Sequence, residues 1–321
     1  MRRNTFYCVL ALIGQFSASA FGQGENRVTL VVDLDNVVTY RSDVIDPGQR
    51  GTSATLTPTP ANRPFTDALN VGDIVAVNGR PARGLWTSRV FSMGFSPTPA
   101  PGFGIADRAS GNLADCKWEF LDAEGRFVGV LLDGGYFPHG VTGGIGAFFG
   151  MRGQMGSPAP ADAPPQPPQR PGRVASMLED PGQRRALGGG TSRIVFTLIP
   201  SERPEILSAY HEDFSPVTAD KPARPGELIL LRASGLGPLV PGTLPSGTEP
   251  FPEPPQEVNS PIQASVGGQP AQVGNKIGWP GFTNTYRVEV RIPAGIAPGE
   301  TSVQLTAAWI PGPSFRLPVG I

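Results

Sequence analysis

The sequence predicts an all-β protein built from two domains, and three observations support this class. Hydrophobic residues make up 39% of the 321-residue chain and fall in short runs of Val, Ile, Leu and Phe. Several runs alternate with polar residues, as strands with one buried face do. The 42 glycines and 37 prolines separate the runs in the manner of turn residues. The length of the chain favours two domains over one.

Residues 1–23 are expected to be a secretory signal peptide. Two arginines precede the apolar run "FYCVLALIG", and the small residues "SASA" follow it. We expect cleavage after Ala20 or near Gln23, and therefore a secreted or periplasmic protein. The apolar run is shorter than the roughly 20 residues that span a bilayer. No later stretch is apolar enough to predict a membrane span.

Cysteine, histidine and charge exclude several classes of function. Loss of the leader removes Cys8 and leaves Cys116 alone, so no intrachain disulfide is expected. His139 and His211 are the only histidines, and we therefore predict no metal site and no cofactor. With 26 basic and 27 acidic residues the chain is nearly neutral, which argues against a nucleic-acid partner.

The first strand is expected in "VTLVVDLDNVVTY". Its alternation puts one set on a buried face, namely Leu30, Val32, Leu34, Val38 and Tyr40. Thr29, Asp33 and Asp35 are expected on the opposite, solvated face. A calcium loop at the two aspartates is disfavoured, because the glycine at loop position six and the glutamate at position twelve are absent.

Two hairpins are expected after this strand. Asn78-Gly79 is a hairpin-turn signal between two apolar runs. In "DCKWEFLDAEGRFVGVLLDGGYF", the residues Cys116, Trp118 and Phe120 alternate with Lys117 and Glu119. A turn near Gly125 then leads into a further strand. Cys116 is interpreted as a small apolar side chain of its strand rather than a nucleophile.

The stretch "VTGGIGAFFGMRGQM" could bind phosphate or bend a sheet. A phosphate loop would need Gly-Lys-Ser/Thr, or Gly-x-Gly-x-x-Gly opening a helix, and neither is present. Glycines among strands mark bends, bulges and close backbone contacts. We interpret the motif as structural, and its glycines are Gly143, Gly144, Gly146, Gly150 and Gly153.

This motif resembles the glycine-rich hairpin of the allene oxide cyclase and dirigent family. The resemblance covers about residues 27–200 and implies an eight-stranded antiparallel barrel. "GSPAPADAPPQPPQRPG" (residues 156–172) is expected to be an extended, disordered insertion, because "TSRIVFTLIP" supplies the closing strand. The resemblance also implies a homo-oligomer formed through the barrel.

Members of that family bind apolar or phenolic molecules in the barrel, and some cyclise them with acidic residues. The resemblance therefore suggests Asp115, Glu119 and Asp133, with Asp107, as candidate acids. It suggests Trp86, Trp118 and Phe120 as pocket walls. The alternatives are that Glu119 forms an exposed pair with Lys117 and that the aromatic residues fill the core.

The second domain is expected over residues 204–321 as a β-sandwich. Its strands are predicted in "PEILSAY", "RPGELILLRASGLGP", "IQASVGGQPAQV", "TYRVEVRIPAGIAPGE" and "SVQLTAAW". "SGLGP", "VGG" and "VRIP" resemble the immunoglobulin-like IPT/TIG module of secreted soil-bacterial proteins. That module has no chemistry of its own.

These observations predict a secreted, non-enzymatic protein with a structural, adhesive or binding role at the cell envelope or outside the cell. Its partner would be a surface glycan or a small apolar ligand. The alternative is a carrier of small apolar molecules, or a dirigent-type isomerase, that uses the barrel interior.

Overall fold

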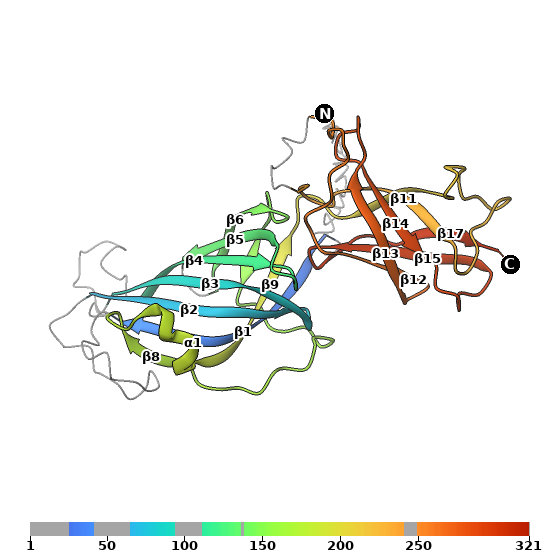
Figure 1. Cartoon of the computed structure of the whole chain (residues 1–321). Helices are drawn as coiled ribbons and strands as arrows, with labels where there is room; N and C mark the ends of the chain where they lie inside the picture. Colours follow the sequence, from blue (N-terminus) through green and yellow to red (C-terminus); the bar gives the residue numbers. More distant parts are fainter. Residues whose placement is uncertain (1–25, 42–64, 94–110, 136–137, 241–248, 321) are drawn as a thin grey trace, which may run out of the picture.

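The computed structural model describes residues 26–41, 65–93, 111–135, 138–240 and 249–320 (Figure 1). The expected signal peptide lies outside these residues. Two β-rich domains follow each other along the chain, which confirms the predicted all-β fold class. Within the described residues, no helix has the length and hydrophobicity needed to cross a membrane.

The first domain is a closed barrel of eight antiparallel strands. In spatial order they are β2 (Phe65–Val77), β3 (Arg80–Met93), β4 (Gly111–Leu121), β5 (Phe127–Gly135), β6 (Gly140–Gly146), β7 (Arg152–Met155), β9 (Gly190–Ile199) and β1 (Val28–Arg41). Pairing of β1 with β2 closes the barrel, and β9 joins β7 to β1. A short outer strand, β8 (Arg173–Ser176), runs parallel to β1.

The two ends of the barrel differ. The turns β2–β3, β4–β5 and β6–β7 lie at one end, which we call the near end because the second domain contacts it (Figure 1). The connections β1–β2, β3–β4, β5–β6 and β7–β9 leave from the opposite end, which we call the far end.

A bulge in β1 reverses which side chains face the barrel interior. Leu30, Val32 and Leu34 face inward as expected, but the pairing with β2 and β9 shifts after Leu34. Asn36 adopts φ +51°, and Val37 then packs against the interior. Val38 and Tyr40 are buried, as predicted, but not on the face shared by Leu30, Val32 and Leu34: they form a separate small cluster with Ala175 of β8.

The proline-rich segment 156–172 lies along the outside of β1 and β9. Arg193 of β9 donates to the carbonyls of Pro164 (2.6 Å) and Pro165 (3.1 Å), and also pairs with Asp33. Asp33, expected to be solvated, is consequently only 3% exposed. These contacts correct the expectation of a disordered tract: proline has no backbone N–H, but its carbonyl oxygen still accepts, and Arg193 donates to two such carbonyls.

A second cluster of charged side chains lies beneath the segment that follows β8. The short helix α1 (Arg184–Leu187) brings Arg184 and Arg185 to Asp73 of β2, which also accepts from Asn36 (3.1 Å). Nearby, Arg173 forms two hydrogen bonds with Glu179 at 2.7 and 2.8 Å. The outer wall of β1 and β2 is thus a second packed layer.

The glycine motif shapes the β6–β7 turn and its neighbours. A Cβ at Gly144 would lie 2.4 Å from the carbonyl oxygen of Phe148, and one at Gly153 would lie 2.1 Å from that of Thr197. Gly146 and Gly150 have φ of +66° and +72°, where glycine is favoured. Gly143 meets open space, so it alone has no structural requirement for glycine.

The second domain is one curled antiparallel sheet around its own core. Its strands are β10 (Glu205–Tyr210), β11 (Leu228–Ser234), β12 (Ile262–Val266), β13 (Gln269–Gly278), β14 (Tyr286–Arg291), β15 (Gly299–Ala307), β16 (Ile310–Pro311) and β17 (Phe315–Val319). β13 pairs with both β12 and β14 and so connects the two halves. The core between them is apolar and includes Ile229, Val288 and Leu305.

A hairpin of the second domain closes the near end of the barrel. We expected a strand to continue through Trp309, but β15 ends at Ala307 and a two-residue turn follows. Ala308 and Trp309 have φ of +47° and +63°, which is unfavourable for residues with a Cβ. Trp309 is 6% exposed and its ring lies 5.9 Å from that of Phe120. Burial of the indole offsets the strain of the turn.

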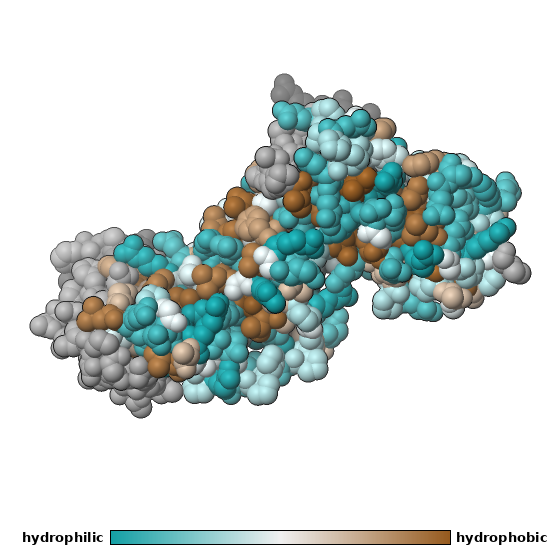
Figure 2. All heavy atoms as spheres, in the orientation of Figure 1, coloured by the Kyte–Doolittle hydropathy of each residue, from teal (hydrophilic) through white to brown (hydrophobic). Residues whose placement is uncertain are grey.

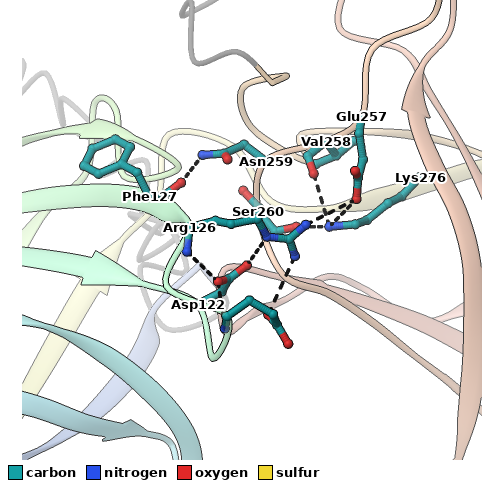
Figure 3. Close-up of polar contacts among 9 residues, drawn as sticks. Asp122, Arg126, Phe127, Glu257, Val258, Asn259, Ser260 and Lys276 are labelled. Atoms are coloured by element: carbon teal, nitrogen blue, oxygen red, sulfur yellow. Dashed lines mark hydrogen bonds and ion pairs between the residues drawn. The ribbon is translucent and has the colours of Figure 1, made fainter.

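Polar contacts complete the junction between the domains (Figure 3). Asn259 donates to the carbonyl oxygen of Phe127 at the start of β5. Arg126 lies 3.7 Å from Glu257, which in turn lies 3.5 Å from Lys276. The β4–β5 turn of the barrel is therefore held directly by the second domain.

Candidate functional site

The barrel interior contains all three aromatic residues suggested as pocket walls. Trp118 and Phe120 are 0% exposed, and Trp86 stacks on Trp118 with ring centres 5.3 Å apart. Phe196 meets Trp118 edge-on at 5.0 Å, and Phe148 lies 4.9 Å from Phe120. These rings pack against one another in the interior next to the near end, as core side chains do.

The candidate acids are split between the two faces of the barrel wall. Asp115 is exposed on the outside, and Glu119 forms a 2.6 Å ion pair with Lys117 there. Neither faces the interior, so their candidacy as interior acids is corrected by the alternation of β4. Asp133 of β5 faces inward and is 3% exposed. Asp107 lies outside the described residues.

Asp133 belongs to a polar cluster inside an otherwise apolar barrel. Its Oδ2 accepts from Nε1 of Trp118 at 2.5 Å, and its Oδ1 lies 2.6 Å from Nδ1 of His139. The same Nδ1 lies 3.5 Å from Sγ of Cys116, whose thiol donates to Ser88 Oγ at 3.2 Å. The cross-strand pairs Ser88–Cys116 and Cys116–Asp133 bring these side chains together.

This geometry does not make Cys116 a catalytic nucleophile. Nδ1 of His139 donates to the Asp133 carboxylate, so it has no lone pair with which to take the thiol proton. Burial, the largest cause, and the charge of Asp133 raise the pKa of Cys116 to about 12, although the Ser88 hydroxyl opposes the shift. A thiol with this pKa is protonated at neutral pH and unreactive.

The same three residues are a potential metal-ligand set. Donor atoms of Cys116, Asp133 and His139 all lie within 4.8 Å of one another, and all three residues are buried. The small number of histidines and cysteines excluded sites that need several of either, but not a mixed set such as this one. Its signal in the sequence is an inward-facing cysteine in one strand, together with Asp133 and His139 on either side of the connection that follows the next strand.

A second candidate site lies on the second domain. It is a hollow of about 570 Å³ lined by His211, Glu212, Asp213, Lys221, Pro222, Arg224, Pro225 and Glu227. Glu227 Oε1 lies 2.5 Å from His211 Nδ1, and its Oε2 accepts from the Arg224 backbone (2.7 Å). Hydrogen bonds from Ser215 and then Lys221 lower the pKa of Asp213 well below its ordinary value. The hollow therefore presents charged groups of both signs.

A group of aromatic side chains begins at the residue that follows two lining residues of this hollow. The turn that contributes Glu212 and Asp213 continues into Phe214, which is 51% exposed at φ +62°. The Phe214 and Phe282 rings lie 6.3 and 5.8 Å from that of Trp279. Arg232 stacks over Phe282 at 5.3 Å. We call Phe214, Trp279 and Phe282 the aromatic edge.

Comparison with known proteins adds no relative. No protein-family model matches the chain. No curated protein matches it either. The barrel and immunoglobulin-like resemblances therefore remain predictions, and the functional argument depends on the geometry of the two sites.

Proposed function

We propose that this is an exported, non-enzymatic binding protein that acts at the cell envelope or outside the cell. The observation that carries the proposal is the packing of aromatic side chains against one another inside the barrel. Trp118, Phe120, Phe148 and Phe196 occupy the space next to the near end, and Trp309 covers that end. The barrel is then a scaffold, and binding takes place on its surface or on the second domain.

The aromatic edge and the hollow are the binding surface in this proposal, and a surface glycan is the partner. Exposed aromatic rings supply apolar contact area with little loss of conformational freedom. The carboxylates and cations of the hollow, among them Asp213 and Lys221, can hydrogen-bond hydroxyl groups. A non-glycine residue at positive φ is strained, and Phe214 adopts this backbone in the turn that presents it.

The carrier or isomerase alternative has less support. It requires an acid facing open space inside the barrel, whereas the carboxylate of Asp133 is hydrogen-bonded to Trp118 and His139.

Exposed apolar side chains on the outer wall of the barrel bear on the oligomeric state. They include Leu85, Leu132 and Ile145. Figure 2 shows hydrophobic side chains interspersed among hydrophilic ones on one barrel face. These side chains are consistent with the homo-oligomer that the barrel resemblance implies.

The test is retention on insoluble cell-envelope polysaccharide, compared between the wild type and the double variant Phe214→Ala, Phe282→Ala. We expect at least tenfold weaker retention of the double variant. Phe149→Ala is the matched control, because Phe149 is a more exposed phenylalanine (65%) on the barrel. Equal retention of all three proteins would reject the aromatic edge as the binding surface. Saturable binding of a phenolic compound inside the barrel would favour the alternative.

A further inference from the structure

The polar cluster at the far end of the barrel interior has no role in the proposed surface binding. It combines a thiol, an imidazole and a carboxylate from three consecutive segments of the barrel wall: β4, β5 and the residues before β6. We propose that Cys116, Asp133 and His139 bind a single zinc-type divalent ion that ties these three segments together.

The donor atoms have the chemistry and spacing that zinc requires. Zinc takes thiolate, imidazole and carboxylate ligands, and tetrahedral coordination separates sulfur from nitrogen by about 3.6 Å. The Sγ–Nδ1 distance of 3.5 Å agrees with this. Nδ1 and Oδ1, now 2.6 Å apart, must separate to about 3.3 Å, a shift of less than 1 Å.

The surroundings of the cluster support the three ligands. Trp118 donates to Oδ2 of Asp133, which orients Oδ1 towards His139. The backbone carbonyl of His139 accepts from Met155 of β7 at 2.9 Å, which fixes the residue that precedes β6. Such outer contacts orient metal ligands and raise affinity.

Trp86 provides a separate indication. Its Nε1 is buried and has no hydrogen-bond partner among the described residues. In the pairing of β3 with β4, Trp86 lies opposite Trp118, two residues from Cys116 on the same inward face. A metal-bound thiolate accepts hydrogen bonds better than a thiol does, so metal binding would satisfy this donor.

Proton balance is simple. The ion displaces the thiol proton of Cys116, which is released to solvent. The Nδ1 proton of His139 moves to Nε2, so that a neutral imidazole offers its Nδ1 lone pair to the ion, and no oxidation or reduction occurs. Three protein ligands leave one position of a tetrahedral ion for water. In a chain expected to lack an intrachain disulfide, the ion would join adjacent strands at the barrel end that the second domain does not contact.

The experiment uses the full chain carrying Cys8→Ala, so that Cys116 is the only thiol. After treatment with a chelator, the protein is titrated with Co²⁺ and then with Zn²⁺. We expect one Co²⁺ per chain, a sulfur-to-cobalt charge-transfer band, the visible spectrum of tetrahedral cobalt, and displacement by Zn²⁺. Absence of the charge-transfer band in the folded protein overturns the proposal and needs no further variant.

Variants then test the individual ligands. Cys116→Ser should abolish the band, and His139→Asn should weaken Co²⁺ binding at least tenfold. His211→Asn is the matched control, because it removes the other histidine, which pairs with Glu227 in the second domain. A band that persists in Cys116→Ser, or equal losses in the two histidine variants, contradicts the site. Zinc should raise the melting temperature of the unsubstituted site and leave that of Cys116→Ser unchanged.

The metal test and the glycan test are independent. Loss of polysaccharide retention in the Phe214, Phe282 variant leaves the cobalt spectrum unchanged if both proposals hold. A missing cobalt spectrum has no consequence for the aromatic edge.

Discussion

The two domains bury different kinds of groups. Every Asp, Glu or Arg that is buried in the described part of the chain belongs to the barrel, and these are Asp33, Asp73, Asp122, Asp133, Arg173, Glu179 and Arg184. The second domain buries apolar side chains around Ile229 and Val288. Five of these residues lie in or beneath the segment between β7 and β9, which covers the outer face of β1 and β2: Asp33, Asp73, Arg173, Glu179 and Arg184. Asp122 instead pairs with Arg126 in the β4–β5 turn, and Asp133 lies inside the barrel. Charges buried in this way require partners.

The largest expected effect comes from breaking the contact between the two domains. Trp309→Ala should lower the free energy of unfolding by about 3–5 kcal/mol, because it removes a large buried side chain from the near end of the barrel. Calorimetry should show one transition in the wild type and two in the variant. Phe149→Ala, at an exposed position, should change stability by no more than about 0.5 kcal/mol. A single, unshifted transition in Trp309→Ala would mean that the hairpin does not couple the domains.

A smaller effect on the free energy of unfolding is expected at low pH, where the barrel loses the contribution of the buried Asp73 carboxylate. Burial alone would raise the pKa of Asp73, but hydrogen bonds from Arg185, Arg184 and Asn36 outweigh it and lower the pKa. A lowered pKa means that the carboxylate stabilises the fold above its unfolded pKa of about 3.9 and that this contribution is lost as pH falls through the folded pKa.

Asp73→Asn should therefore cost about 2 kcal/mol at pH near 7, the usual size for hydrogen bonds to a charged group. In urea unfolding at stepwise lower pH, the difference from the wild type should shrink below about pH 4. Asp220→Asn, at an exposed position of the second domain, serves as the control and should show no difference at any pH. A cost that is independent of pH would show that the charge of Asp73 is not what stabilises this wall.

The smallest expected effect on stability is the difference between alanine substitutions at two neighbouring glycines of the barrel hairpin. Gly144→Ala should destabilise the barrel by about 1–2 kcal/mol, because the new Cβ meets the backbone oxygens of Phe148 and Val130. Gly143→Ala meets nothing and should be neutral or slightly stabilising. Thermal unfolding of the two single variants measures the difference. Equal costs would mean that the motif is needed for flexibility rather than for close approach.

The sequence was sufficient to predict the fold class but not which face of the strand each residue occupies throughout. Alternation in β4 correctly placed Cys116, Trp118 and Phe120 on one buried face. In β1 the same argument failed after Asn36, because a single bulge reverses the alternation of everything that follows. The burial of Asp33 was equally unpredictable from local pattern, since it depends on Arg193, 160 residues further along the chain, and on the proline segment whose carbonyls Arg193 also binds.

The candidate sites were harder to predict for the same reason. Asp133 and Cys116 are paired only through the register of β4 with β5, and His139 joins them through the turn before β6. The aromatic edge combines Phe214 with Trp279 and Phe282, which come from turns far apart in the chain. Sequence periodicity predicts which face of a single strand each side chain occupies. Predicting a site also requires the register between strands, which decides which side chains lie opposite each other.

In the described part of the chain, the second domain contacts only the near end of the barrel. Tags or inserted domains are therefore expected to disturb the junction of the domains at the near end but not at the far end. The connections β1–β2, β3–β4, β5–β6 and β7–β9 all leave from the far end, away from Trp309 and Asn259. A peptide tag or an inserted domain in the β1–β2 or β3–β4 connection would therefore leave the junction of the domains in place. The same tag in the β4–β5 turn would separate Phe127 from Asn259. For protein engineering, the β1–β2 and β3–β4 connections are therefore the expected insertion points, whereas the β5–β6 connection carries His139 and the β7–β9 connection packs on the outer wall.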